Sequence, residues 1–218
     1  FTTYDGTLWS SDGSAEGTGV VRQFGRNHTP NQLTSAGDQL YFEVYNADYG
    51  SELWKSDGTS AGTVIVQHIN TQKLWWKTGT NDSYPSGLTD VDGISYFTAS
   101  DGIHARQIWR TTDTGVEMVT DISNDATSPR DLTAVGQTLF FVATNPQQDY
   151  QTGLWKVDES GAVPLTNSDG LPVAVRDIVN VNGTAYFVGA DFEHGEELWK
   201  TDGTVEGTVL VKDILADD

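Results

Sequence analysis

The sequence predicts an all-β protein, a five-bladed β-propeller of four-stranded antiparallel blades, on three observations. A stretch at residues 52–66 recurs almost unchanged at residues 197–211 and, in shorter form, at residues 7–18. Tryptophan marks every copy, at positions 9, 54, 109, 155 and 199, so the steps between copies are 45, 55, 46 and 44 residues. No segment shows a sustained apolar period of 3.6 residues, so essentially no helix is expected. Tandem units of this length with short apolar runs are typical of propeller blades.

The five units are expected to form a single domain over residues 1–218, because one unit cannot bury its own apolar face. Their approximate bounds are residues 1–30, 31–84, 85–128, 129–172 and 173–218. Residues 1–3 align with residues 97–99, so the first unit lacks its inner strand and the start of the next strand. In a five-bladed ring, residues beyond Asp218 would supply the missing strand. The alternative is that the chain belongs to a larger propeller.

The second unit shows the plan of a blade in full, with four strands in chain order. Its predicted elements are an inner strand at 32–36, a Gly37-Asp38 turn, a strand at 39–44, a loop at 45–51, a strand around Trp54, an Asp57-Gly58 turn and a strand at 63–66. Alternating apolar residues, with aromatic and branched side chains, favour strands here.

The later units repeat this plan with hairpin turns of their own. These turns are Asp92-Gly93, Gly136-Gln137 and Asn182-Gly183. Asp-Gly and Asn-Gly pairs tolerate positive φ at both central positions, which tight hairpins require. Each second strand carries an aromatic pair, at 41–42, 96–97, 140–141 and 186–187. The repeated tryptophan is expected to pack between neighbouring blades, where burying about 200 Å² stabilises by at most about 5 kcal/mol.

Charge and composition exclude several classes of partner. The chain carries 31 acidic and 12 basic residues, a net charge of -19, which disfavours nucleic acid because phosphate would be repelled. Cysteine is absent, so neither a disulfide nor a thiol contributes. No apolar run approaches the roughly 20 residues of a membrane-spanning helix, so we expect no membrane insertion. The sequence begins at Phe1 and shows no signal peptide, so we expect it to be processed or trimmed.

The repeats resemble the bacterial ELWxxDGT repeat, found in large secreted or surface-attached proteins and thought to form propellers. Residues 52–59 and 197–204 match the motif in full, and residues 7–14 differ only at Thr7 and Ser14. The copies at 107–114 and 153–160 keep the tryptophan and an aspartate but lose the glycine. The resemblance implies a propeller architecture, an extracellular or cell-surface location and a place in a larger protein or assembly. It implies no reaction.

The Asp-Gly turn also resembles the Asp-box, a hairpin between the third and fourth strands of sialidase-like propellers, in which the aspartate is structural. We therefore expect Asp12, Asp57 and Asp202 to bond nearby backbone N–H groups. Calcium ligation is the alternative, although the spacing of an EF-hand is absent. We expect no cofactor.

Candidate ligand residues lie at the opposite end of the blades, where the connections vary. The longest connection, residues 71–84, contains Trp75 and Trp76 between lysines, a pattern suited to stacking on sugar rings or to a protein contact. The alternative is that both cover the blade. The loops between second and third strands contribute Tyr49, His104, Tyr150 and His194, which either line a shallow site or pack against the neighbouring blade.

Four arginines fall at this same end: Arg26, Arg106, Arg130 and Arg176. Arg130 and Arg176 begin adjacent inner strands, so we expect their guanidinium groups to converge. Two converging guanidinium groups would bind a carboxylate or sulfate. The alternative is that each pairs with a neighbouring carboxylate.

Three functions remain open from the sequence. The favoured one is a non-catalytic extracellular module that recognises glycan or protein through this variable end. The others are a structural spacer in an adhesin or extracellular assembly, and a hydrolase or lyase acting on acidic sugars. An enzyme would need a carboxylate pair or a Tyr/His acid–base pair at reaction distance, and no spacing singles one out.

Overall fold

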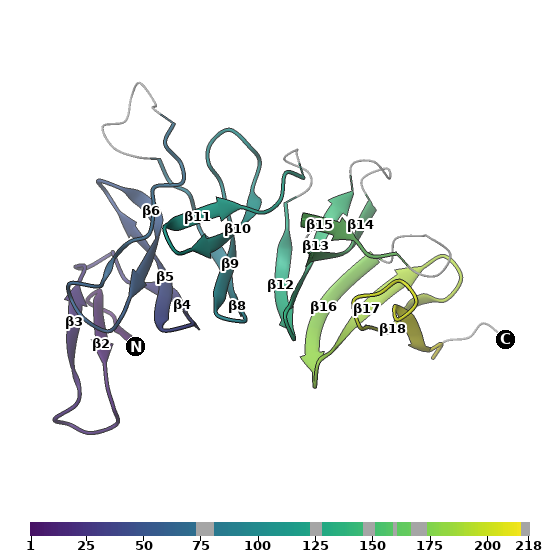
Figure 1. Cartoon of the computed structure of the whole chain (residues 1–218), viewed down its shortest axis with the longest axis horizontal. Coiled ribbons are helices and arrows are strands. Elements are labelled where there is room, and N and C mark those ends of the chain that lie inside the picture. Colours follow the sequence, from purple (N-terminus) through teal and green to yellow (C-terminus); the bar gives the residue numbers. More distant parts are fainter. Residues whose placement is uncertain (73–80, 123–127, 146–150, 159–160, 167–173, 215–218) are drawn as a thin grey trace. The chain divides into compact units, whose positions relative to one another are not determined.

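The computed structural model describes residues 1–72, 81–122, 128–145, 151–158, 161–166 and 174–214. These residues form strands β1 to β19 and contain no helix (Figure 1). Accordingly, no helix in the described ranges is long and apolar enough to cross a membrane. The chain divides into two compact parts, the N-terminal part, Phe1–Met118, and the C-terminal part, Val119–Asp218.

The N-terminal part contains three antiparallel sheets. The first sheet consists of β1 (Thr2–Thr3), β2 (Thr7–Ser10) and β3 (Gly19–Gln23). The second consists of β4 (Asn31–Ala36), β5 (Gln39–Asn46), β6 (Gly50–Ser56) and β7 (Val64–Ile65). The third consists of β8 (Ser86–Val91), β9 (Ile94–Ala99), β10 (Gln107–Thr112) and β11 (Gly115–Met118). The first sheet has three strands where the other two have four, as the alignment of residues 1–3 predicts.

The C-terminal part contains two four-stranded sheets, again with the strands in chain order. The fourth sheet consists of β12 (Arg130–Val135), β13 (Thr138–Asn145), β14 (Gln151–Asp158) and β15 (Gly161–Pro164). The fifth consists of β16 (Ala174–Val181), β17 (Thr184–Asp191), β18 (Gly195–Thr201) and β19 (Val209–Lys212). Each sheet is a meander of antiparallel hairpins, which is the strand order of a propeller blade.

The Asp-Gly and Asn-Gly hairpins between first and second strands have the backbone that their residues predict. Asp92 and Gly93 have φ of 52° and 84°, and Asn182 and Gly183 have φ of 52° and 85°. Positive φ at both central positions matches the right-handed twist of the flanking strands.

A β-bulge that the sequence analysis did not predict occurs near the start of each complete inner strand. The register shifts between Asn31 and Thr34 in the second sheet, and at the corresponding place in the three others. The bulged residue has positive φ in every case: Gln32, Gly87, Asp131 and Asp177. In two of the sheets, a threonine that follows the bulge makes a side-chain hydrogen bond to the next sheet. Thr34 Oγ1 contacts Leu88 O at 3.4 Å, and Thr133 Oγ1 contacts Ile178 O at 3.4 Å, so both bonds join neighbouring sheets.

The Asp-Gly turns are closed networks of hydrogen bonds. Asp57 Oδ1 accepts bonds from Thr59 N at 2.8 Å and from Thr59 Oγ1 at 2.7 Å, and Thr63 Oγ1 donates to Thr59 O at 2.6 Å. Asp12 and Asp202 make the same two bonds to residues 14 and 204. These bonds lower the pKa of all three carboxylates. The prediction that these aspartates bond nearby backbone N–H groups is confirmed.

The motif glycine that follows each turn has a packing role. A Cβ added to Gly62 would lie 2.1 Å from Asp57 Oδ1, and one on Gly207 would lie 2.0 Å from Asp202 Oδ1. Only glycine therefore leaves room for the carboxylate in its bonded position.

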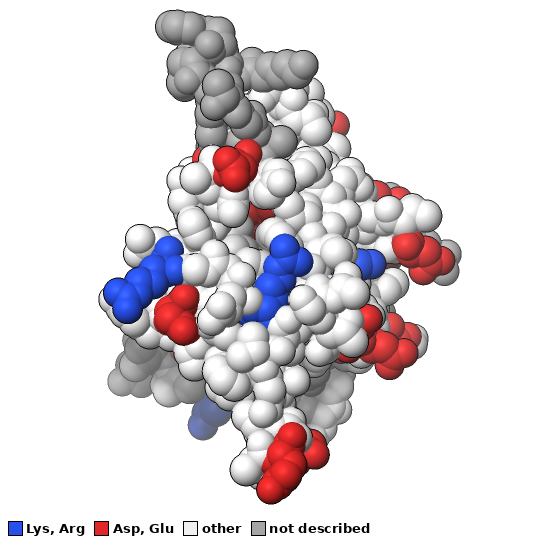
Figure 2. All heavy atoms as spheres, turned by 90° about the vertical axis from the view of Figure 1, so that its left-hand side faces the viewer, with Lys and Arg blue, Asp and Glu red and all other residues white. Residues whose placement is uncertain are grey.

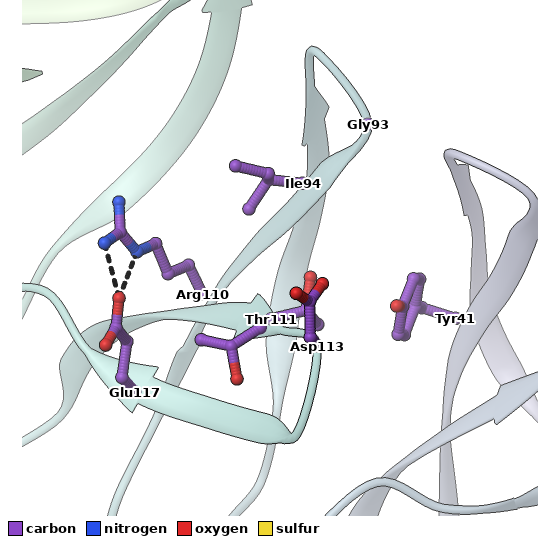
Figure 3. Close-up of a pocket in the computed structure, with 8 residues that line it drawn as sticks. Tyr41, Gly93, Ile94, Arg110, Thr111, Asp113 and Glu117 are labelled. Atoms are coloured by element: carbon purple, nitrogen blue, oxygen red, sulfur yellow. Dashed lines mark hydrogen bonds and ion pairs between the residues drawn. The ribbon is translucent and has the colours of Figure 1, made fainter.

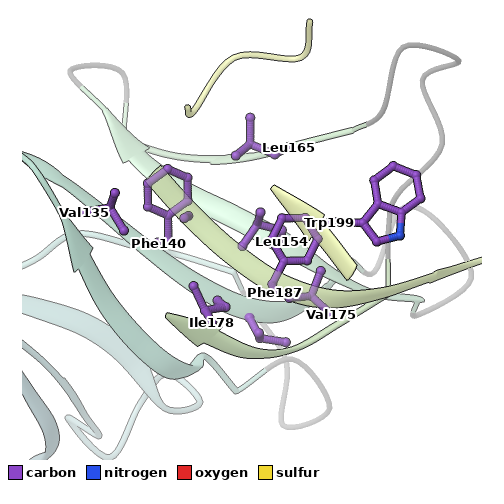
Figure 4. Packing of buried hydrophobic residues seen from close by; sticks show 10 residues of the cluster. Val135, Phe140, Leu154, Leu165, Val175, Ile178, Phe187 and Trp199 are labelled. Carbon is purple, nitrogen blue, oxygen red and sulfur yellow. The ribbon is translucent and has the colours of Figure 1, made fainter. Parts of the chain in front are cut away.

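The cores lie between neighbouring sheets and contain the repeated tryptophans. Trp54 packs with Leu8 and Val21 of the first sheet, and Trp109 packs with Tyr41 and Leu53 of the second. In the C-terminal part, Trp199 belongs to a cluster with Phe140, Leu154 and other residues of the fourth sheet (Figure 4). The predicted packing of the tryptophan between blades is confirmed at these three positions.

Candidate functional site

The start of each inner strand and the loop between second and third strands lie at the same end of a sheet. Besides Arg26 and Arg106, the sequence singles out eight residues at this end, of which Trp75, Trp76 and Tyr150 lie outside the described residues. The other five are Tyr49, His104, His194, Arg130 and Arg176, and each has its own set of contacts.

His104 and His194 occupy equivalent turns in the third and fifth sheets. His104 Nδ1 lies 2.7 Å from Asp101 Oδ2, and its backbone N donates to Asp101 Oδ1 at 2.8 Å. His194 Nδ1 lies 3.0 Å from Asp191 Oδ2, and its backbone N donates to Asp191 Oδ1 at 2.6 Å. The bond with Asp191 raises the pKa of His194. Both imidazoles are thus bonded within their own loops through Nδ1, and this structural role accounts for Nδ1 without a ligand.

Tyr49 is 43% exposed, and its ring centroid lies 5.5 Å from that of His68. His68 Nδ1 lies 3.4 Å from Glu52 Oε1, and Ser83 Oγ donates to Glu52 Oε2 at 2.7 Å. Glu52 is the glutamate of the repeated motif, and it is fully buried. A buried carboxylate needs such partners, so this group of residues stabilises the end of the second sheet.

Arg130 and Arg176 line one hollow of about 240 Å³ in the C-terminal part, together with Thr152, Ala190, Glu196 and four further residues of β16 and β17. Both side chains therefore border one hollow, whereas the convergence of their guanidinium groups on one ligand stays a prediction. Their side chains are 52% and 55% exposed, so both guanidinium groups are accessible.

Each of these arginines also pairs with a carboxylate, as the alternative interpretation predicts. Arg176 Nη1 donates to Asp177 Oδ2 at 2.6 Å, and Arg176 Nη2 donates to Glu196 Oε2 at 3.1 Å. These bonds, chiefly the one to Glu196, raise the pKa of Arg176. Arg130 Nε lies 3.6 Å from Asp131 Oδ2. Counted with the carboxylates that pair with them, the two cations and three anions sum to a local charge of -1, so both guanidinium charges are already balanced.

The other two arginines at this end differ from this pair. Arg106 donates to Thr98 Oγ1 at 2.9 Å and also to Tyr84 O and Ser86 Oγ, and no described carboxylate pairs with it. Partial burial lowers the pKa of Arg106. Arg26 is exposed, and within the described residues it makes no side-chain hydrogen bond.

Metal sites and nucleic-acid surfaces each require a characteristic group of side chains. No group of three or more His, Asp or Glu side chains among the described residues is arranged to hold a metal ion. On the face drawn in Figure 2, described basic and acidic side chains are scattered among uncharged ones, without a continuous basic patch. Nucleic-acid recognition uses such a patch, so this face offers no support for it.

No protein-family model matches the chain. No curated protein sequence matches it either. Several solved structures resemble it at 13% sequence identity. The β-propeller domain of the Trilobed protease from Pyrococcus furiosus matches 92% of this chain and 62% of its own, with a TM-score of 0.54. A puromycin-hydrolyzing peptidase from Mycobacterium tuberculosis matches 94% of this chain, with a TM-score of 0.55, and an acylaminoacyl peptidase from Pyrococcus horikoshii matches 97%, with a TM-score of 0.54.

The fold is that of a β-propeller. This chain spans 31% and 36% of the two peptidase chains, and less than two thirds of the Pyrococcus furiosus domain. At such low identity the similarity concerns the fold alone, because propellers support both catalysis and binding.

Proposed function

We propose that the chain is a non-catalytic binding module that recognises a neutral glycan through the hollow lined by Arg130 and Arg176. The observation that carries this proposal is the grouping of guanidinium, carboxylate and hydroxyl groups around one accessible space, with Thr152 and Glu196 in the lining. Sugar hydroxyls both donate and accept hydrogen bonds, so paired Arg and Glu side chains complement adjacent hydroxyls. Because the local charge sums to -1, an acidic sugar gains less here than a neutral one.

The same carboxylates argue for binding over hydrolysis. Glycoside hydrolysis needs two carboxyl groups that flank the bond to be broken, one of them able to give up a proton. At this hollow, Asp177 and Glu196 both contact the single guanidinium group of Arg176. The arrangement fixes the arginine side chain and commits both carboxylates to the same cation.

We further propose an extracellular or cell-surface location within a larger protein or assembly. The support comes from the ELWxxDGT resemblance and from the net charge of -19, which suits exposed, soluble surfaces. A structural spacer remains the second candidate, and the repeated motif supports it because the Asp-Gly turns serve the scaffold.

The test is binding of the purified chain to an array of neutral, uronic and sulfated glycans, with and without calcium. A neutral glycan should bind, and Arg130→Gln and Arg176→Gln should each weaken binding about tenfold, since each removes a charge-assisted hydrogen bond. Arg26→Gln is the matched control, because Arg26 is an exposed arginine in the N-terminal part. A preference for uronic or sulfated glycans would support an anion site at the two arginines instead. No binding at all would favour the structural spacer. Release of reducing ends would favour the enzyme.

Trp75 and Trp76 provide a separate arm of the same test. If they stack on the sugar, Trp75→Ala/Trp76→Ala abolishes binding while the arginine variants leave it unchanged. That outcome would move the proposed site to the connection of residues 71–84.

A further inference from the structure

The turn between the third and fourth strands differs between the third and fifth sheets. In the fifth sheet, residues 202–208 connect β18 to β19 and form a complete Asp-Gly turn. In the third sheet, only Asp113 and Thr114 connect β10 to β11, with Thr112 paired directly to Gly115. The third sheet therefore lacks most of the connection that the fifth sheet has.

In the C-terminal part, the long turn docks on the preceding sheet. Lys156 Nζ donates to Gly203 O at 2.8 Å. A Cβ added to Gly203 would lie 3.4 Å from Phe140 Cζ, so the glycine lies close to the aromatic ring. Gly203 also has a φ of 94°, which favours glycine. Phe140 and Lys156, opposite each other on β13 and β14, together form the docking position for this turn.

The same pair of positions exists in the second sheet, where Tyr41 lies opposite Lys55 on β5 and β6. The neighbouring third sheet offers only its short turn, and a hollow of about 380 Å³ remains, lined by Tyr41 and Asp113 among others (Figure 3). Its remaining lining residues are Gly93, Ile94, Arg110, Thr111, Thr112 and Glu117. The hollow lies at the end of the third sheet that carries the β8–β9 and β10–β11 turns.

Two polar groups that line this hollow, and the ammonium of Lys55 opposite Tyr41, are available. No side-chain hydrogen bond or ion pair to another described residue uses the Tyr41 hydroxyl, the Lys55 ammonium or the Asp113 carboxylate, whereas Arg110 is already bonded to Glu117 at 2.5 Å (Figure 3). Thr111 Oγ1 accepts a bond from Ser95 N at 3.0 Å, so its proton remains free to be donated. The site thus lacks an acceptor for Lys55 and a donor for Asp113. A backbone turn supplies both.

We propose that this hollow binds a glycine-containing β-turn of a partner polypeptide, in place of the turn that the third sheet lacks. The carbonyl of the turn accepts a hydrogen bond from Lys55, as the carbonyl of Gly203 does from Lys156. The glycine packs against the ring of Tyr41, and a backbone N–H of the turn donates to Asp113.

The probe is a cyclic peptide with the sequence of residues 201–208, titrated into the full chain and followed by NMR and calorimetry. Wild-type protein should bind it, with chemical shift changes at Tyr41 and Thr111. Lys55→Met should raise the dissociation constant about tenfold or more, since a charge-assisted bond is lost. Lys212→Met is the matched control, because Lys212 is an exposed lysine of β19 that lies opposite Leu198 and not opposite an aromatic residue. Tyr41→Phe should change the affinity little, because Phe140 serves the docked turn without a hydroxyl.

Two further variants separate this site from a general affinity for peptides. A cyclic peptide with alanine in place of the glycine that corresponds to Gly203 should not bind. Replacing residues 111–116 by the sequence of residues 201–208 should fill the hollow from within the chain and abolish binding, while circular dichroism shows an intact fold.

Several outcomes would overturn the proposal. They are no binding at millimolar peptide, equal binding by the grafted variant, and displacement of the peptide by simple sugars. Failure of glycan binding at Arg130 and Arg176 would leave the result unaffected, since those residues lie in the other part of the chain.

Discussion

Replacing Trp54 with alanine tests the packing that joins the first two sheets. Trp54 is 6% exposed, and its ring lies at 90° to that of Phe24, with centroids 5.1 Å apart. The guanidinium carbon of Arg22 lies 5.0 Å from the centroid of the Trp54 ring. Removing a buried tryptophan to alanine costs about 3–5 kcal/mol, which is a large share of the roughly 5–15 kcal/mol that stabilises a domain.

The cost can be divided with a second variant. Arg22→Met removes the cation–π contact, worth about 1 kcal/mol in a half-buried setting, as well as the bond from Arg22 Nη1 to Thr63 O at 2.5 Å. In a double-mutant cycle with Trp54→Ala, we expect a coupling of about 1 kcal/mol between the two positions. Arg26→Met provides the control without these contacts.

Urea unfolding measures the total, and hydrogen exchange locates it, because repeated units do not always unfold together. Protection should fall in β2, β3, β5 and β6 and persist in the C-terminal part. A loss below about 1 kcal/mol, or an equal loss of protection in every sheet, would refute packing of Trp54 between the first and second sheets.

Three further predictions concern the turns and a second tryptophan. Gly62→Ala should displace the Asp57 carboxylate from its bonded position. Wild-type Asp57 contributes stability above pH 3.8, and this stability is lost as the pH falls through its lowered folded pKa. NMR titration of the variant should show the pKa of Asp57 returning towards 3.8. The raised pKa of His194 lies above 6.5, so its contribution to stability is present below pH 6.5 and is lost as the pH rises through the folded pKa. Asp191→Asn should lower the pKa of His194 again, as measured by NMR titration. Trp155→Phe removes the bond from Trp155 Nε1 to Ala143 O at 3.1 Å, so urea unfolding should show about 1 kcal/mol more loss than Trp54→Phe, since Trp54 Nε1 has no bonding partner.

The strands, the hairpins and the Asp-Gly turns could be predicted from the sequence because their causes are local. Positive φ at Asn182 and Gly183, for example, follows from the two residues themselves. The bulge at Asp131 could not be predicted in the same way. It depends on which residue of β12 lies opposite β13, and that register is a property of the pair of strands.

The candidate site was predictable only in part. That Arg130 and Arg176 border one hollow follows from their equal positions in adjacent units. The pairing of Arg176 with Glu196 depends on the hairpin of β17 and β18, which returns Glu196 to the start of β16. The burial of Glu52 was also not predictable, because a glutamate repeated in a motif ordinarily lies in solvent.

All five units keep the tryptophan, but some copies lose the motif glycine, and this loss has a structural consequence. Where both the aspartate and the glycine of the motif are present, as in the fifth sheet, the turn forms its own hydrogen bonds and docks on Phe140 and Lys156. Where they are lost, as in the third sheet, the connection shortens to Asp113 and Thr114, and the position of Tyr41 and Lys55 is left open. A repeat that has lost part of its motif therefore leaves a docking position open for a partner, and the strands on either side are unchanged. If the grafted turn fills that position and stabilises the third sheet, the hollow is a consequence of loop length; if the graft is expelled, the lining of the hollow itself has diverged from a docking surface.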